Sequence, residues 1–99
     1  MNHPTKYEAL AGSAEAAANA VQAEIEKAQQ GLESVDSLRN LLFIKSRLEE
    51  ISKILRGNEV FKDDRFKRSM GRIIVDTWPL RHSLGESISQ IEYEFERLK

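Results

Sequence analysis

The chain has no cysteine among its 99 residues and only two histidines, His3 and His82. It can form neither a disulfide nor a thiolate-bound metal site, and nothing in it calls for an oxidising compartment. The two histidines lie far apart in the sequence, and no His-x-x-x-His or Asp-x-Asp spacing occurs. Because ligand sets for zinc and calcium need such clustering, we expect no metal and no cofactor.

Long apolar runs are also missing. The longest uninterrupted stretch, Leu-Leu-Phe-Ile at 41–44, is far shorter than the ~20 residues that span a bilayer. No basic segment followed by an apolar run lies near Met1, so the sequence does not predict a secretory signal. We therefore expect a cytoplasmic protein with no membrane partner.

Glycine and proline are sparse, with five single glycines and two prolines. No glycine-rich loop follows a strand-like segment, so a phosphate-binding loop is not predicted. His82 has Glu86 one helical turn later, but Ser83 is its direct neighbour and points to a different part of the helix surface. We interpret His82 as a surface histidine near a helix start. The sequence predicts no catalytic residue and a protein that is not an enzyme.

What the sequence does contain is apolar residues at helical spacing along nearly its whole length. This pattern predicts an all-α fold, a small helical bundle of three to four antiparallel helices in a single domain over residues 1–99. Residues 1–4 are expected to be disordered. The predicted helices span about 5–30, 35–56, 60–77 and 78–98, with the last two joined at a corner at Trp78-Pro79, where Thr77 can serve as the N-cap.

Several residues have predicted places in this bundle. Ser34 or Asp36 can cap the helix over 35–56, and Gly31 can stop the helix before it. Phe43 and Ile54 give the helix over 35–56 a second apolar face, so we expect it to be central. Trp78 is interpreted as a core anchor with its indole N–H near the surface. Apolar stripes are expected to face the core at Tyr7, Leu10, Ala14, Ala17, Val21, Ile25, Ala28 and Leu32; at Phe66, Met70, Ile73, Ile74 and Thr77; and at Leu80, Leu84, Ile88, Ile91, Phe95 and Leu98.

All nine alanines lie between Ala9 and Ala28. A helical wheel sorts them into a seam that faces the core and a row on the opposite side. That outward row consists of Ala9, Ala16, Ala20 and Ala23. Small side chains at spacings of three and four allow another helix to approach closely, although alanine is also the best helix former in water. The row is therefore a candidate helix-packing interface.

A basic ridge is predicted on the helix over 60–77. Residues 53–82 carry eight basic and four acidic side chains, a net charge of +4. Arg65, Arg68 and Arg72 share one face at spacings of three and four, and Phe61 projects onto the same side. A solvated helix face is the ordinary explanation. The functional interpretation is a partner-binding surface for an acidic protein or for phosphates.

Three functions fit these features. The first is a non-enzymatic protein-interaction module of the immunity, antitoxin, adaptor or assembly-factor type, which binds a partner protein through an exposed helix surface; this class rests on analogy with other small helical domains. The second is a nucleic-acid-binding regulator that uses the basic ridge. The third is a self-assembling structural bundle, in which the alanine row forms a homodimer. We favour the first.

Overall fold

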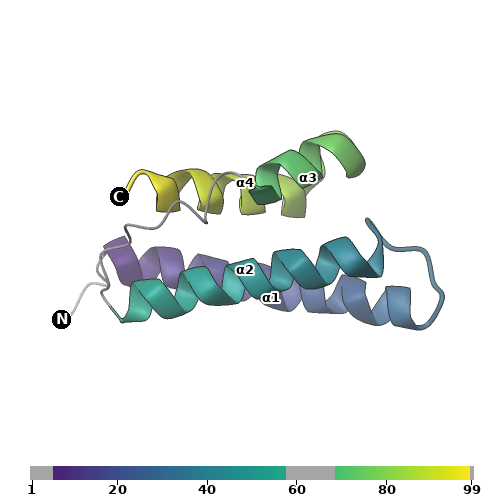
Figure 1. The fold of residues 1–99 in the computed structure, drawn as a ribbon, viewed down its shortest axis with the longest axis horizontal. Helices are drawn as coiled ribbons and strands as arrows, with labels where there is room; N and C mark the ends of the chain where they lie inside the picture. Colours follow the sequence, from purple (N-terminus) through teal and green to yellow (C-terminus); the bar gives the residue numbers. More distant parts are fainter. Residues whose placement is uncertain (1–5, 58–68, 99) are drawn as a thin grey trace.

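In the computed structural model of this chain, the described residues are 6–57 and 69–98. That part of the chain is helical, without strands, which confirms the predicted all-α bundle (Figure 1). Its helices are α1 (Lys6–Gln29), α2 (Leu38–Arg56), α3 (Ser69–Thr77) and α4 (Ser83–Glu96). The predicted disorder of 1–4 and the predicted start of the third helix near residue 60 lie outside the described residues.

Helices α1 and α2 lie side by side and run in opposite directions (Figure 1). Near their connecting loop, the Val35 backbone N–H donates to the Glu24 carboxylate at 2.9 Å. Nearer the other end, the Arg56 guanidinium donates to the Glu15 carboxylate at 2.6 and 2.7 Å. The end of α1 thus contacts the segment just before α2, and the first half of α1 contacts the end of α2, as in a helical hairpin.

The hairpin loop ends α1 and starts α2 by specific local geometry. Gly31 has φ of 74°, a left-handed conformation that glycine adopts without steric cost, and it follows α1 as predicted. The N-cap of α2 is Ser37, whose hydroxyl accepts from the Asn40 backbone N–H. The prediction of Ser34 or Asp36 as the cap was therefore wrong. Asp36 instead accepts from the Ser37 backbone N–H and the Asn40 amide, so it stabilises the same turn from outside the helix.

Helices α3 and α4 form a second antiparallel pair. The backbone N–H groups of Met70 and Gly71, at the start of α3, donate to the carboxylate of Glu92 near the end of α4, each at 3.0 Å. At the other end of the pair, Gly85 of α4 lies directly against Ile74. Helix α4 packs against α1, and α3 packs against α4 and makes fewer contacts with α2.

The core lies between these helices and includes most of the predicted stripe positions. Ala11 and Ala18, which the wheel did not assign to the core, are also buried. They are buried because α1 packs against both α2 and α4, which requires a wider apolar arc than one neighbour does. Helix α2 is therefore not uniquely central, since α1 also has two neighbours. The buried apolar residues are Leu10, Ala11, Ala14, Ala17, Ala18, Val21, Ile25, Leu41, Ile44, Leu48, Ile51, Leu55, Met70, Ile74, Trp78, Ile88, Ile91 and Phe95.

The connection between α3 and α4 departs from the sequence prediction. Helix α4 begins at Ser83 after His82, and no side chain caps it, so Thr77 is not its N-cap. Thr77 is exposed, and the single proton of its hydroxyl is shared between the Ile73 carbonyl at 2.7 Å and the Asp36 carboxylate at 2.9 Å. Leu80 lies in the connection, before α4 starts, and is 92% exposed rather than part of the apolar stripe. Leu32, which follows Gly31, is likewise outside its helix and 57% exposed.

Two glycines inside helices provide a matched test of this packing. A Cβ atom on Gly85 would lie 2.9 Å from Ile74 Cγ2 and 3.1 Å from Trp78 Cε3, whereas one on Gly12 would meet nothing within 4 Å. We expect Gly85→Ala to lower the free energy of unfolding by about 1–3 kcal/mol, because both neighbours are buried. We expect Gly12→Ala to raise it by up to about 1 kcal/mol through helix propensity. Urea unfolding measures both, and equal shifts would contradict the close crossing at Gly85.

Candidate partner-binding surface

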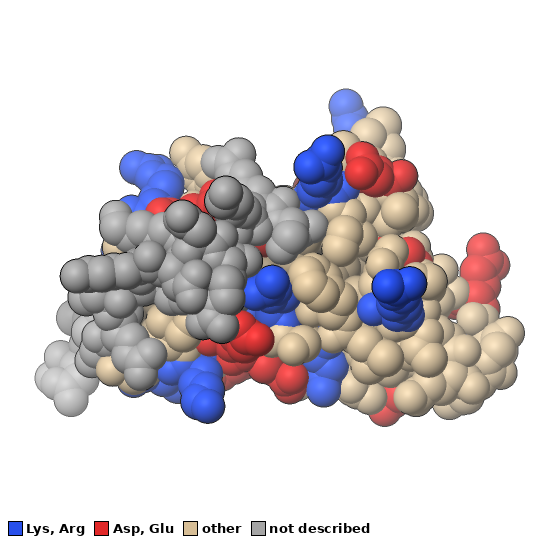
Figure 2. All heavy atoms as spheres, in the orientation of Figure 1, with Lys and Arg blue, Asp and Glu red and all other residues tan. Residues whose placement is uncertain are grey.

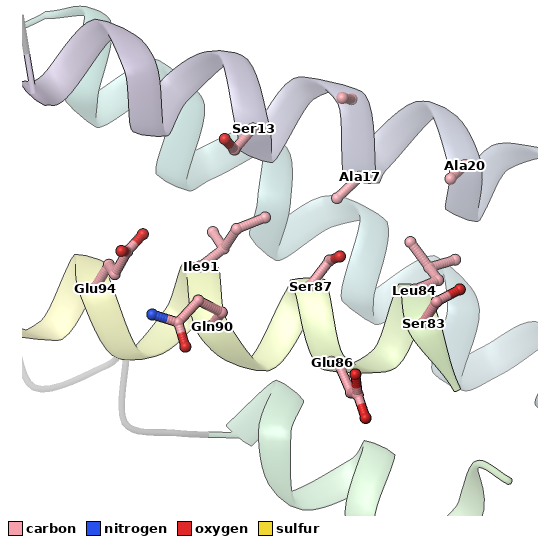
Figure 3. A pocket seen from close by; sticks show the side chains of 11 residues that line it. Ser13, Ala17, Ala20, Ser83, Leu84, Glu86, Ser87, Gln90, Ile91 and Glu94 are labelled. Carbon is pink, nitrogen blue, oxygen red and sulfur yellow. The ribbon is translucent and has the colours of Figure 1, made fainter. Parts of the chain in front are cut away.

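A groove with a volume of about 810 Å³ lies between α1 and α4. Figure 3 shows Ser13 and Ala17 of α1 opposite Leu84, Ser87 and Ile91 of α4. Ala16 and Ala20 of α1, with Ser83, Glu86, Gln90 and Glu94 of α4, complete its lining. Most of these side chains are small, so the two helix backbones are within reach of anything placed in the groove.

The structure divides the predicted alanine row. All four members are exposed, but only Ala16 and Ala20 line the groove. Ala9 lines a smaller adjoining cavity of about 200 Å³, together with Lys6, Leu10, Ser13 and Glu94. Ala23 lines neither cavity. Since Ser13 and Glu94 belong to both cavities, the groove continues past Ala9 toward the start of α1.

The groove is acidic along α4. Its only charged lining residues, within the described part of the chain, are Glu86 and Glu94, and the adjoining cavity adds Lys6 at the far end. On the face seen in Figure 2, the basic and acidic side chains of the described residues are intermixed, without a large patch of either sign.

The predicted basic ridge lies mostly outside the described residues, since Phe61, Arg65 and Arg68 belong to 58–68. Its remaining member, Arg72, is in α3 and exposed, as the wheel predicted. The role of these four residues in binding a partner stays a prediction.

A second hollow, of about 560 Å³, lies at the connection of α3 and α4, and it was not predicted from the sequence. Val75 and Leu80 line it and are 81% and 92% exposed. Beneath them Trp78 is buried, with 6% exposed, and its indole N–H donates to Asp36 at 2.9 Å. This confirms Trp78 as a core anchor. Exposed apolar side chains can mark binding sites, and Leu80 escaped prediction because its spacing matches the stripe of α4.

His82 forms one wall of this second hollow. Its ring meets that of Trp78 edge to face, with centroids 5.4 Å apart. It is partly buried rather than fully on the surface, and its Nδ1 is a buried atom without a hydrogen-bond partner among the described residues. The side chains of Ser83 and Glu86 make no hydrogen bond to the His82 ring, and Glu86 bonds only the His82 backbone carbonyl, through its own N–H. Among the described residues, His82 therefore forms no nucleophile–base pair with Ser83.

On the side of α1 away from the groove, Glu15 forms an ion pair with Arg56 of α2. Hydrogen bonds from Arg56, and then from Ser52, lower the pKa of Glu15 from 4.5 to about 2. The same contact raises the pKa of Arg56. These groups join α1 to α2 and are paired with one another. We therefore assign them to stability rather than to binding.

The described residues contain no group of three or more His, Cys, Asp or Glu side chains placed to hold a metal ion. None of their helices combines the length and the apolar character needed to cross a membrane.

Comparison with known proteins adds no relative. No protein-family model matches the chain, and no curated protein and no solved structure matches it.

Proposed function

We propose that this protein is a non-enzymatic interaction module, which binds a partner protein in the groove between α1 and α4. A role of the immunity, antitoxin, adaptor or assembly-factor type, carried out in the cytoplasm, is part of this proposal. The observation that carries it is the groove itself: two packed helices leave an open channel lined by Ser13, Ala16, Ala20, Ser83 and Ser87. Small residues in such a channel permit the close approach of a third helix, and a helix laid in a groove is a common mode of recognition.

The charge of the groove argues against nucleic acid or a second copy of this chain as its occupant; a nucleic-acid-binding role of the basic ridge stays a separate prediction. Nucleic acid presents phosphates, which Glu86 and Glu94 would repel at this site. A twofold homodimer would place the same patch of each copy against the other. It would then bring four carboxylates together with few cations to offset them.

The test blocks the groove and leaves the helix intact. Ala16 and Ala20 are exposed groove residues, so we expect Ala16→Glu with Ala20→Glu to fold and to lose the partner. Ala23→Glu is the matched control, because Ala23 is exposed on the same helix but lines neither the groove nor the adjoining cavity. Each form serves as bait for affinity capture from native lysate, with and without nuclease, read by mass spectrometry.

A stoichiometric, nuclease-resistant protein captured by the wild type and the Ala23 variant, but not by the blocked variant, is the expected result. Equal recovery with all three baits would refute the groove as the binding site. Recovery that nuclease abolishes would favour the nucleic-acid alternative. Circular dichroism of the blocked variant checks that the helices remain.

A further inference from the structure

The occupant of the α1/α4 groove can be described by its chemistry, on the basis of the function proposed above. We infer that it is a basic amphipathic helix of a partner protein, with small or apolar side chains on its buried face and Lys or Arg beside them. This inference rests on the charges, the length and the side-chain sizes of the groove.

Charge complementarity is the first argument. The side-chain carboxylates of Glu86 and Glu94 have no hydrogen bond or ion pair with any described residue. No Lys or Arg is among the described residues that line the groove, and the adjoining cavity adds only Lys6 at its far end. Figure 3 shows Glu94 directed toward α1 and Glu86 at the opposite edge of α4. They are eight residues apart, about 12 Å along the helix axis. An occupant parallel to α4 would meet them with cations two turns apart, at spacings of seven or eight residues.

Long basic side chains suit this arrangement. Lys and Arg can lay an apolar stem along the groove wall while the charged end reaches a carboxylate at the rim. An acidic occupant would instead add like charges to a groove that already has two carboxylates. A helix with unpaired positive charge is therefore favoured over a neutral or acidic one.

The length and depth of the groove are the second argument. From Lys6 to Ala20 the two adjoining cavities follow α1 over fourteen residues, about 21 Å. That length matches a partner helix of about four turns. The α1 side of the groove is lined by small residues, including Ser13, Ala16 and Ala17. An occupant helix with small side chains on its contacting face can therefore bring its backbone close to α1.

A displayed library of helical peptides tests this inference directly. Peptides of about fifteen residues, long enough to fill the groove, are randomised on one face and selected on the wild-type protein. Peptides that also bind the Ala16→Glu, Ala20→Glu variant are removed. The expected result is enrichment of Lys or Arg in pairs seven or eight residues apart, beside Ala, Ser or Leu on the selected face.

The recovered peptides are then measured by fluorescence anisotropy against charge variants. We expect Glu86→Gln with Glu94→Gln to weaken binding about fivefold at low salt, the size of two exposed ion pairs. Glu26→Gln with Glu33→Gln is the control of equal charge change, because both residues are exposed and lie outside the groove; it should leave affinity unchanged.

The outcomes separate this inference from the function on which it rests. Two results would overturn the basic occupant while leaving the groove as a binding site. The first is selected peptides that do not bind the blocked variant but are acidic or neutral. The second is selected peptides whose affinity is unchanged by Glu86→Gln with Glu94→Gln. Failure to recover any peptide specific to the open groove would overturn both. A wild-type dimer in sedimentation velocity that the blocked variant dissolves would make the occupant a second copy, and would overturn the inference.

Discussion

Replacing Trp78 by alanine is expected to lower the free energy of unfolding by about 3–5 kcal/mol, as for other buried large aromatic residues. The indole is almost fully buried, contacts Gly85 and His82, and donates its N–H to Asp36. Its loss opens a cavity between α3 and α4 and also removes a link to the α1–α2 loop. Urea unfolding followed by circular dichroism measures the change, since the variant lacks the only tryptophan.

Two variants show which part of Trp78 is responsible. Trp78→Phe keeps most of the buried volume but loses the hydrogen bond to Asp36, so we expect a loss of only about 1–2 kcal/mol. Val75→Ala is the control, because Val75 lies in α3 yet is largely exposed, and it should change stability by less than about 0.5 kcal/mol. If Trp78→Ala costs no more than Val75→Ala, the corner is not part of the core.

Replacing Glu92 by alanine is expected to lower the free energy of unfolding by about 2–3 kcal/mol. The carboxylate is 5% exposed and accepts the backbone N–H groups of Met70 and Gly71. These donors belong to the first turn of α3, which has no earlier carbonyls of its own helix to bind. A buried donor left without an acceptor costs about 1–3 kcal/mol, and negative charge at a helix N-terminus is favourable in addition.

Amide hydrogen exchange can distinguish the loss of the Glu92 hydrogen bonds from a general loss of packing. Amide hydrogen exchange should accelerate at Met70 and Gly71 more than in α2. Glu92→Gln keeps one acceptor oxygen and should have an intermediate effect. Glu94→Ala, on the same helix but exposed, should be nearly neutral. If Glu92→Ala and Glu94→Ala prove equally mild, the contact between α4 and the start of α3 does not stabilise the fold.

Local sequence signals predicted the helices well where they are described. The ends of α1 and α2 match the predicted ranges to within three residues, because Gly31 and the Ser37 region provide strong stop and start signals. The exposure of Ala9, Ala16, Ala20 and Ala23 on α1 was also predictable, since the 3.6-residue period fixes which residues share a face.

Periodicity failed where the helix itself ends. Leu80 fits the spacing of Leu84 and Ile88, but a spacing predicts a shared face only if the chain between stays helical. The connection contains Pro79, and Arg81 has φ of 60°, so Leu80 lies outside α4. The prediction that Leu32 faces the core is wrong for the same reason, because Leu32 follows Gly31 and lies outside α1. Both leucines are exposed because each is separated from its stripe by a break in the helix.

Polar residues with long-range partners were beyond the reach of the sequence. Glu92 lies among Glu94 and Glu96 and looks like part of a solvated face. It is buried because the start of α3, more than twenty residues earlier, presents its N–H groups there. Asp36 was predicted as a helix cap, yet its carboxylate also accepts hydrogen bonds from the Thr77 hydroxyl and the Trp78 indole N–H. No local sequence pattern shows which distant hydrogen-bond donors the fold will place beside these carboxylates.

By itself the sequence determined the helical class, the main breaks between helices and the absence of cysteine-based chemistry, because these depend on neighbouring residues and on composition. It also determined that Ala16 and Ala20 face away from the predicted seam. Only the tertiary structure decided that α4 lies beside them, that Ala23 falls outside the groove and that Glu86 and Glu94 border it. Those facts depend on how separate helices pack, and packing is set by contacts between residues far apart in the chain.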